Sequence, residues 1–196
     1  MITEPYRELN KKLHEKDPMY GASSGKWATV AAKMAEKNQF ASILDYGAGK
    51  GDLSRGLTQI WAGAPVCEVI SYDPAVPGME FKKPCDLVVC TDVLEHIEPE
   101  CLEAVLDDIR DMTRQLAFIT VSTMPAEKTL EDGRNAHVCL HDARWWSDRI
   151  WDRFEVIRME RVGQDIRFVC AREVQLVRKR PVRQFQDIQE QGVAFA

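Results

Sequence analysis

Short, continuously apolar runs alternate along this chain with stretches in which apolar residues recur every three or four positions. The runs predict buried strands at 42–46, 66–73, 86–92 and 116–122. The stretches between them predict amphipathic helices at roughly 25–37, 53–61, 99–112 and 142–150. This order is typical of a parallel sheet covered by helices on both faces.

The last two apolar segments flank Val162-Gly163-Gln164-Asp165, which predicts a tight turn between antiparallel strands. A plain dinucleotide-binding domain would instead end in another parallel unit. The sequence therefore predicts an α/β fold with a doubly wound, Rossmann-like sheet, mostly parallel, that ends in a C-terminal antiparallel β-hairpin. We expect one domain over 26–180, an N-terminal segment at 1–25 and a C-terminal tail at 181–196.

Composition and charge narrow the function classes. Apolar residues make up 45% and charged residues 29% of the chain, and no run approaches the roughly 20 apolar residues of a membrane span. The polar start shows no signal peptide, so we expect a cytoplasmic protein without a membrane partner. A net charge of −5 argues against a long nucleic-acid partner, although 172–184 form a basic run. The six cysteines form no C-x-x-C pair and predict neither a zinc site nor disulfides.

A glycine-rich turn follows the first predicted strand. Gly47, Gly49 and Gly51 open the next helix, and such a turn lets a ligand approach the backbone closely. Asp73 ends the second predicted strand, where an acid can bind the hydroxyl groups of a ribose. Together these features predict a nucleotide-like cofactor.

The charges around the turn distinguish between two cofactors. A pyrophosphate would sit at the helix N-terminus, where Asp52 stands in place of a third glycine and would repel it. S-Adenosylmethionine has no phosphate and carries a sulfonium and an ammonium group, which suit the acidic residues Asp45 and Asp73. The sequence therefore favours S-adenosylmethionine over NAD.

Three motifs carry a resemblance to a known family. LDYGAGKGDLS, SYDP and DLVVCTDVLEHI, in this order, resemble the class I S-adenosylmethionine-dependent methyltransferases, with the pattern of the quinone-biosynthesis enzymes. The resemblance spans roughly 40–172, and the terminal hairpin matches the family's usual seven-stranded sheet. It leaves the adenine contact open, because the segment 74–85 is short. It implies that the residues lining the methionine end are Asp45, Gly47, Gly49 and Gly51, that Asp73 holds the ribose, and that Thr91, Asp92 and Val93 lie beside the cofactor.

The acceptor side is less defined. Cys90-Thr91-Asp92-Val93 is not the motif of enzymes that methylate exocyclic base nitrogens, and Cys85 precedes its strand, at the wrong edge for a nucleophile. We therefore expect an oxygen or nitrogen of a small molecule as the acceptor. The candidates for orienting it or removing its proton are His96, His137 and His141.

Two alternatives stay open. The residues Asp92, Glu95, His96 and His141 are similar to the metal ligands of small-RNA terminal 2′-O-methyltransferases, which would make the chain a metal-assisted RNA ribose methyltransferase. We expect no metal site, because convergence needs a turn after the strand and the loop around His141 has no fixed geometry. The other alternative is a catalytically silent, cofactor-binding partner subunit. The oligomeric state is left open.

The first 25 residues lie outside the motifs. His14, Tyr20 and the small residues at 21–25 suggest a flexible segment that closes over the cofactor. A simple loop before the first helix, with Ser24 near its cap, explains the same residues equally well.

Overall fold

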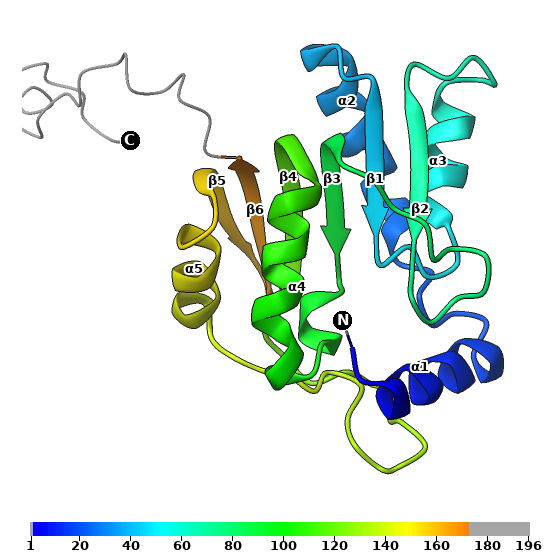
Figure 1. The fold of residues 1–196 in the computed structure, drawn as a ribbon, viewed down its shortest axis with the longest axis vertical. Helices are drawn as coiled ribbons and strands as arrows, with labels where there is room; N and C mark the ends of the chain where they lie inside the picture. Colours follow the sequence, from blue (N-terminus) through cyan, green and yellow to red (C-terminus); the bar gives the residue numbers. More distant parts are fainter. Residues whose placement is uncertain (1, 173–196) are drawn as a thin grey trace, which may run out of the picture.

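The structure, a computed structural model, describes residues 2–172 and contains one six-stranded sheet in the order β2-β1-β3-β4-β6-β5. The first four strands are parallel, and β6 lies antiparallel between β4 and β5 (Figure 1). The strands are β1 (Ser42–Tyr46), β2 (Glu68–Tyr72), β3 (Cys85–Thr91), β4 (Thr113–Ser122), β5 (Glu155–Val162) and β6 (Asp165–Ala171). The predicted doubly wound sheet with a terminal hairpin is confirmed. The end of the predicted domain and the tail at 181–196 lie outside the described residues.

Five α-helices and two 3-10 turns complete the described part of the chain. They are α1 (Glu4–Lys16), α2 (Ala28–Asn38), α3 (Asp52–Ile60), α4 (Pro99–Met112), α5 (Ala143–Trp151), η1 (Ser24–Trp27) and η2 (Leu94–His96). The helix expected at 25–37 therefore begins as a 3-10 turn. Asp142 caps α5 as expected, since its side chain accepts a hydrogen bond from the Trp145 N–H.

The described residues form six strands, one fewer than the sheet usual for the family that the motifs resemble. No strand forms between β2 and β3, where the chain crosses from the sheet edge over β1 as a loop. A parallel crossover takes about a dozen residues by itself. The segment at 73–84 has only the length of that crossover, and its prolines and glycine disfavour a strand or helix.

Both faces of the sheet are buried, which explains the continuously apolar strands. In β1, Ile43 points to a core shared with α2 and α3, whereas its neighbour Leu44 points to a core shared with α4 and α5. Trp146 is the largest fully buried side chain in the second core. The two layers of helices leave the carboxyl ends of β1 and β3 free of regular cover from either face.

That open edge is covered by α1 and by the loop 123–142 (Figure 1). The helix α1 was not predicted from the sequence. Thr3 caps its N-terminus, since the Thr3 hydroxyl accepts a hydrogen bond from the Tyr6 N–H, and a proline lies in the first turn. Two exposed ion pairs connect it and its C-terminal flank with the loop: Lys12–Glu131 at 2.7 Å and Asp17–Lys128 at 2.6 Å. In residues 2–172 we find no helix with the length and apolar character of a membrane span.

Candidate functional site

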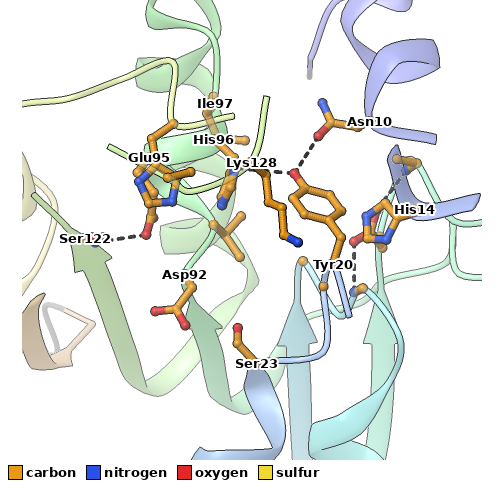
Figure 2. Close-up of a pocket in the computed structure, with 18 of the residues that line it drawn as sticks. Asn10, His14, Tyr20, Ser23, Asp92, Glu95, His96, Ile97, Ser122 and Lys128 are labelled. Carbon is orange, nitrogen blue, oxygen red and sulfur yellow. Dashed lines mark hydrogen bonds between the residues drawn. The ribbon is translucent and has the colours of Figure 1, made fainter. Parts of the chain in front are cut away.

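A cavity of about 450 Å³ lies at the carboxyl ends of the parallel strands, under α1 and the loop 123–142 (Figure 2). This is the edge at which open α/β sheets bind their ligands. Its walls come from α1, the segment 19–26, the glycine turn, the ends of β2 and β3, and the loop after β4. Segments that are far apart in the sequence therefore meet around one space.

The glycine turn has the backbone that the sequence predicted. Gly47, Gly49 and Gly51 have φ angles of 78°, 53° and 73°, which other residues rarely adopt. A Cβ on Gly47 would lie 2.4 Å from a Val93 methyl carbon, and one on Gly49 would lie 2.4 Å from the carbonyl oxygen of Gly21. The turn is therefore packed too closely for side chains, with the N-terminal segment resting on it.

Asp73 holds this turn in place. Its Oδ2 accepts a hydrogen bond from the Gly49 N–H at 3.0 Å, and its Oδ1 accepts one from the Ala75 N–H at 2.9 Å. The carboxylate is 8% exposed and lines the cavity. Each carboxylate oxygen can accept a second hydrogen bond, so the side chain can hold the turn and a ligand at once.

Asp45 lies beneath the turn and does not line the cavity. Its side chain is 1% exposed, and Oδ2 has no hydrogen-bond partner in the described part of the chain. Burial, and then the charge of Asp73, raise its pKa to about 7. A cation bound above the turn would favour the ionised form.

The predicted cofactor residues thus fall into two groups. Those that line the cavity are Gly47, Gly49, Asp73, Asp92 and Val93. Asp45, Gly51 and Thr91 are absent from its lining, and the Thr91 side chain is buried with an unpartnered hydroxyl. Asp52, which the sequence analysis placed against a pyrophosphate, is ion-paired with Arg55 and also lies outside the lining.

Asp92 stands at the end of β3 with a φ of 57°. Its Oδ2 lies 2.7 Å from the Lys26 ammonium, and its Oδ1 accepts a hydrogen bond from the Thr120 hydroxyl at 2.9 Å. Burial raises its pKa, but the lysine charge and the hydrogen bonds outweigh burial and hold the pKa below its ordinary value. Asp92 is therefore an ionised, already paired carboxylate.

Glu95, His96 and His137 gather on the other side of the cavity. One metal-ligating atom of each lies within 4.8 Å of the others. Glu95 is fully buried, and burial raises its pKa to about 8. Burial, followed by the nearby His137, lowers the pKa of His96 to about 4, so this imidazole is neutral near pH 7.

His141, by contrast, lies away from this group. Its ring stacks on Trp145 with centroids 3.5 Å apart and planes at 9°. It does not line the cavity, although the sequence analysis grouped it with His96. The four-residue spacing from His141 to Trp145 therefore serves this stacking, with His141 just before α5 and Trp145 in its first turn.

The N-terminal segment contributes Tyr20, which was expected in a segment over the cofactor, and also Tyr6 and Asn10, which were not predicted. The Tyr20 hydroxyl donates to Asn10 Oδ1 at 2.9 Å and lies 3.3 Å from His96 Nδ1 (Figure 2). The Tyr6 hydroxyl donates to the carbonyl of His96. The cap, proline and apolar spacing of α1 were the available signal for this wall.

Comparison with known proteins agrees with this geometry. A family profile described as a methyltransferase domain matches residues 21–164, so the chain belongs to the methyltransferase-domain family. The class I S-adenosylmethionine-dependent resemblance drawn from its motifs is thereby confirmed. No curated protein sequence matches the chain significantly.

Solved structures of similar fold include methyltransferases. The 1,6-didemethyltoxoflavin-N1-methyltransferase of Burkholderia thailandensis, solved with bound 1,6-didemethyltoxoflavin and S-adenosylhomocysteine, has a TM-score of 0.57 at 14% identity over 89% of this chain and 92% of its own. DhpI with S-adenosylhomocysteine gives 0.57 and 14%, over 87% and 98%. An O-methyltransferase family protein of B. thailandensis gives 0.56 and 12% over 80% of this chain, which spans 59% of that protein. At these identities the likeness establishes the fold.

Proposed function

We propose that this protein transfers a methyl group from S-adenosylmethionine to an oxygen or nitrogen of a small molecule. The observation that carries the proposal is the division of one cavity into two ends. Gly47, Gly49 and Asp73 form one end, and Glu95, His96 and His137 form the other. The volume of about 450 Å³ falls within the range of small-molecule sites, about 300–1,000 Å³.

The first end fits S-adenosylmethionine on three observations. Gly47 and Gly49 line the cavity, and their positive φ angles turn the backbone there so that a ligand can contact it. Asp73 keeps acceptor capacity for ribose hydroxyls, and the orphaned oxygen of Asp45 lies below, where an ammonium group would favour its ionisation. Gly51 shapes the turn, and Asp92 and Val93 would border the cofactor from the end of β3, whereas Thr91 is buried and does not line the cavity.

When bound, S-adenosylmethionine supplies an electrophilic methyl group and leaves as a neutral thioether. The chain must align the acceptor with that group and accept the acceptor's proton. His96 and His137 line the cavity side by side, so these two imidazoles are the side chains proposed to meet the acceptor. His141 stacks outside the cavity and takes no part in the proposal.

We also propose that the first 25 residues act as a lid on the domain that follows. The Gly21 carbonyl accepts a hydrogen bond from the Lys50 N–H at 2.9 Å, and the Lys50 ammonium donates to the His14 carbonyl at 2.5 Å. Tyr20 then lies between His14 and His96 (Figure 2). Such a cover would exclude water from the transfer and would have to open for the ligands.

Two measurements test the proposed function. Calorimetric titration should give stoichiometric binding of S-adenosylhomocysteine and none of NAD. Incubation with methyl-labelled cofactor and a cell extract, fractionated by size, should place label in the small-molecule fraction. Label in RNA would replace the substrate class with the RNA alternative, and binding without label in any fraction would favour the silent subunit. Absence of cofactor binding would overturn the proposal.

A further inference from the structure

The acceptor end of the cavity contains a set of metal-ligating side chains that differs from the one the sequence suggested. Glu95, His96 and His137 each place one ligating atom within 4.8 Å of the others, and His141 is not among them. We propose that these three residues bind a divalent first-row transition ion, with coordination positions left open to the acceptor. The inference rests on the proposed function for the identity of that acceptor, but the ion site itself does not.

The hydrogen bonds of both imidazoles fix the same tautomer. His96 Nδ1 lies 2.9 Å from the carbonyl oxygen of Ala136, and His137 Nδ1 lies 2.5 Å from that of Met124. A carbonyl oxygen only accepts, so each Nδ1 carries the hydrogen and each Nε2 keeps its lone pair. Metal-binding histidines are oriented in this way, with the second nitrogen donating to a backbone carbonyl.

The Glu95 carboxylate likewise has one fixed oxygen and one oxygen left for an ion. Ser122 N–H donates to Glu95 Oε1 at 2.9 Å, which fixes the side chain. Oε2 is completely buried and has no partner in the described residues. A buried acceptor without a partner is costly, and a cation at this point would satisfy it.

The backbone that carries the ligands is well held. Glu95 and His96 lie in the turn η2, which brings neighbouring side chains to one side as a strand could not. The Glu95 carbonyl accepts from the Cys139 N–H at 3.0 Å, and the His137 N–H donates to Asn135 Oδ1 at 2.9 Å. The structure thus supplies the turn and the fixed loop that the sequence analysis could not assume, with His137 as the second imidazole.

The donor set indicates the class of ion. Two imidazoles and one carboxylate suit zinc, iron(II), cobalt or manganese better than magnesium, which prefers oxygen ligands. With bonds of about 2.0–2.2 Å, ligand atoms around a tetrahedral ion lie about 3.4 Å apart, so small side-chain rotations would close the site. The bound ion would keep one positive charge beyond its ligands.

The positive charge of the bound ion would activate one class of methyl acceptor. An acceptor hydroxyl that binds the ion loses its proton more readily, and the proton passes to water. The resulting oxyanion neutralises the site and is the nucleophile that methyl transfer needs. With His96 and His137 occupied as ligands, the acceptor class is a molecule with an ionisable hydroxyl group rather than an amine.

Cobalt(II) titration of chelator-treated protein tests the site directly, because the visible absorption of cobalt reports its ligands. We expect one equivalent to bind with a nitrogen and oxygen spectrum, free of the intense near-ultraviolet band of a thiolate ligand. Glu95→Gln, His96→Ala and His137→Ala should each weaken cobalt binding at least tenfold. His141→Ala is the matched control and should bind like the wild type.

Calorimetry with S-adenosylhomocysteine on the same samples separates the two proposals. Absence of cobalt binding with intact cofactor binding overturns the ion site and leaves the methyltransferase proposal standing. Intact cobalt binding without cofactor binding overturns the methyltransferase proposal and leaves the ion site standing. Loss of cobalt in His141→Ala, or its retention in His137→Ala, would also overturn the assigned ligand set. Circular dichroism confirms that each variant is folded.

Discussion

Replacing the buried carboxyl group of Asp45 by an amide tests the electrostatics beneath the glycine turn. The side chain is 1% exposed, and burial together with the charge of Asp73 raises its pKa from 3.8 to about 7. Asparagine has nearly the same shape and cannot ionise. The variant Asp45→Asn therefore removes the cost of a buried charge while the packing stays the same.

The sign follows from the direction of the shift. The pKa is higher in the folded chain, so the folded chain binds the proton more tightly than the unfolded chain. The contribution of this carboxyl group to stability is complete below its unfolded pKa of 3.8, declines as the pH rises toward about 7, and is absent above that. This loss amounts to roughly 4 kcal/mol at pH 8, of which roughly 1.5 kcal/mol has occurred by pH 5.

Urea unfolding of wild type and Asp45→Asn at pH 5 and pH 8 measures the difference. From pH 5 to pH 8, the free energy of unfolding of the variant should rise by roughly 2.5 kcal/mol relative to that of the wild type. The unpaired amide of the variant has a cost that does not vary with pH, so it does not affect this difference. Asp148→Asn, at an exposed position of α5, controls for the loss of one negative charge. Stability curves that run parallel in wild type and Asp45→Asn would refute the reasoning.

Three further predictions concern the two ends of the cavity. Asp73→Ala should weaken S-adenosylhomocysteine binding by about 1.5–3 kcal/mol in calorimetry, because a charged acceptor is lost, and should leave the chain folded; unchanged affinity would place the ribose elsewhere. Gly49→Ala should lower the melting temperature and abolish cofactor binding, since its Cβ would lie 2.4 Å from the Gly21 carbonyl oxygen. The control is Gly133→Ala, at a residue with a φ of 86° and no atom within 4 Å of an added Cβ. It should cost only about 1–2 kcal/mol of stability, from backbone strain. Equal effects of the two substitutions would mean that the contact with Gly21 is unimportant. Tyr20→Phe should keep cofactor affinity and shift the pH profile of methyl transfer, because only the hydroxyl between Asn10 and His96 is removed; an unchanged profile would separate Tyr20 from the acceptor end.

The sequence alone determined the sheet and the cofactor end because these depend on local patterns. A continuously apolar strand, a glycine turn and an acid at the next strand end are adjacent in the sequence to the elements that they shape. Parallel strands bring their carboxyl ends to one edge whatever lies between them, so the positions of Gly47, Gly49 and Asp73 followed from topology.

Only the tertiary structure decided which histidine joins the acceptor end and what covers the cavity. His137 and His141 are four residues apart in one irregular loop, and no periodicity tells which of them turns inward. The choice comes from the bond of His137 to Met124 within the loop, from the bond of Cys139 to Glu95 outside it, and from the stacking of His141 on Trp145. The cover by α1 likewise depends on contacts between residues ninety positions apart, such as Tyr6 with His96. Such contacts leave no local pattern in the sequence, because loop geometry is fixed by the partners that the loop meets in the folded chain.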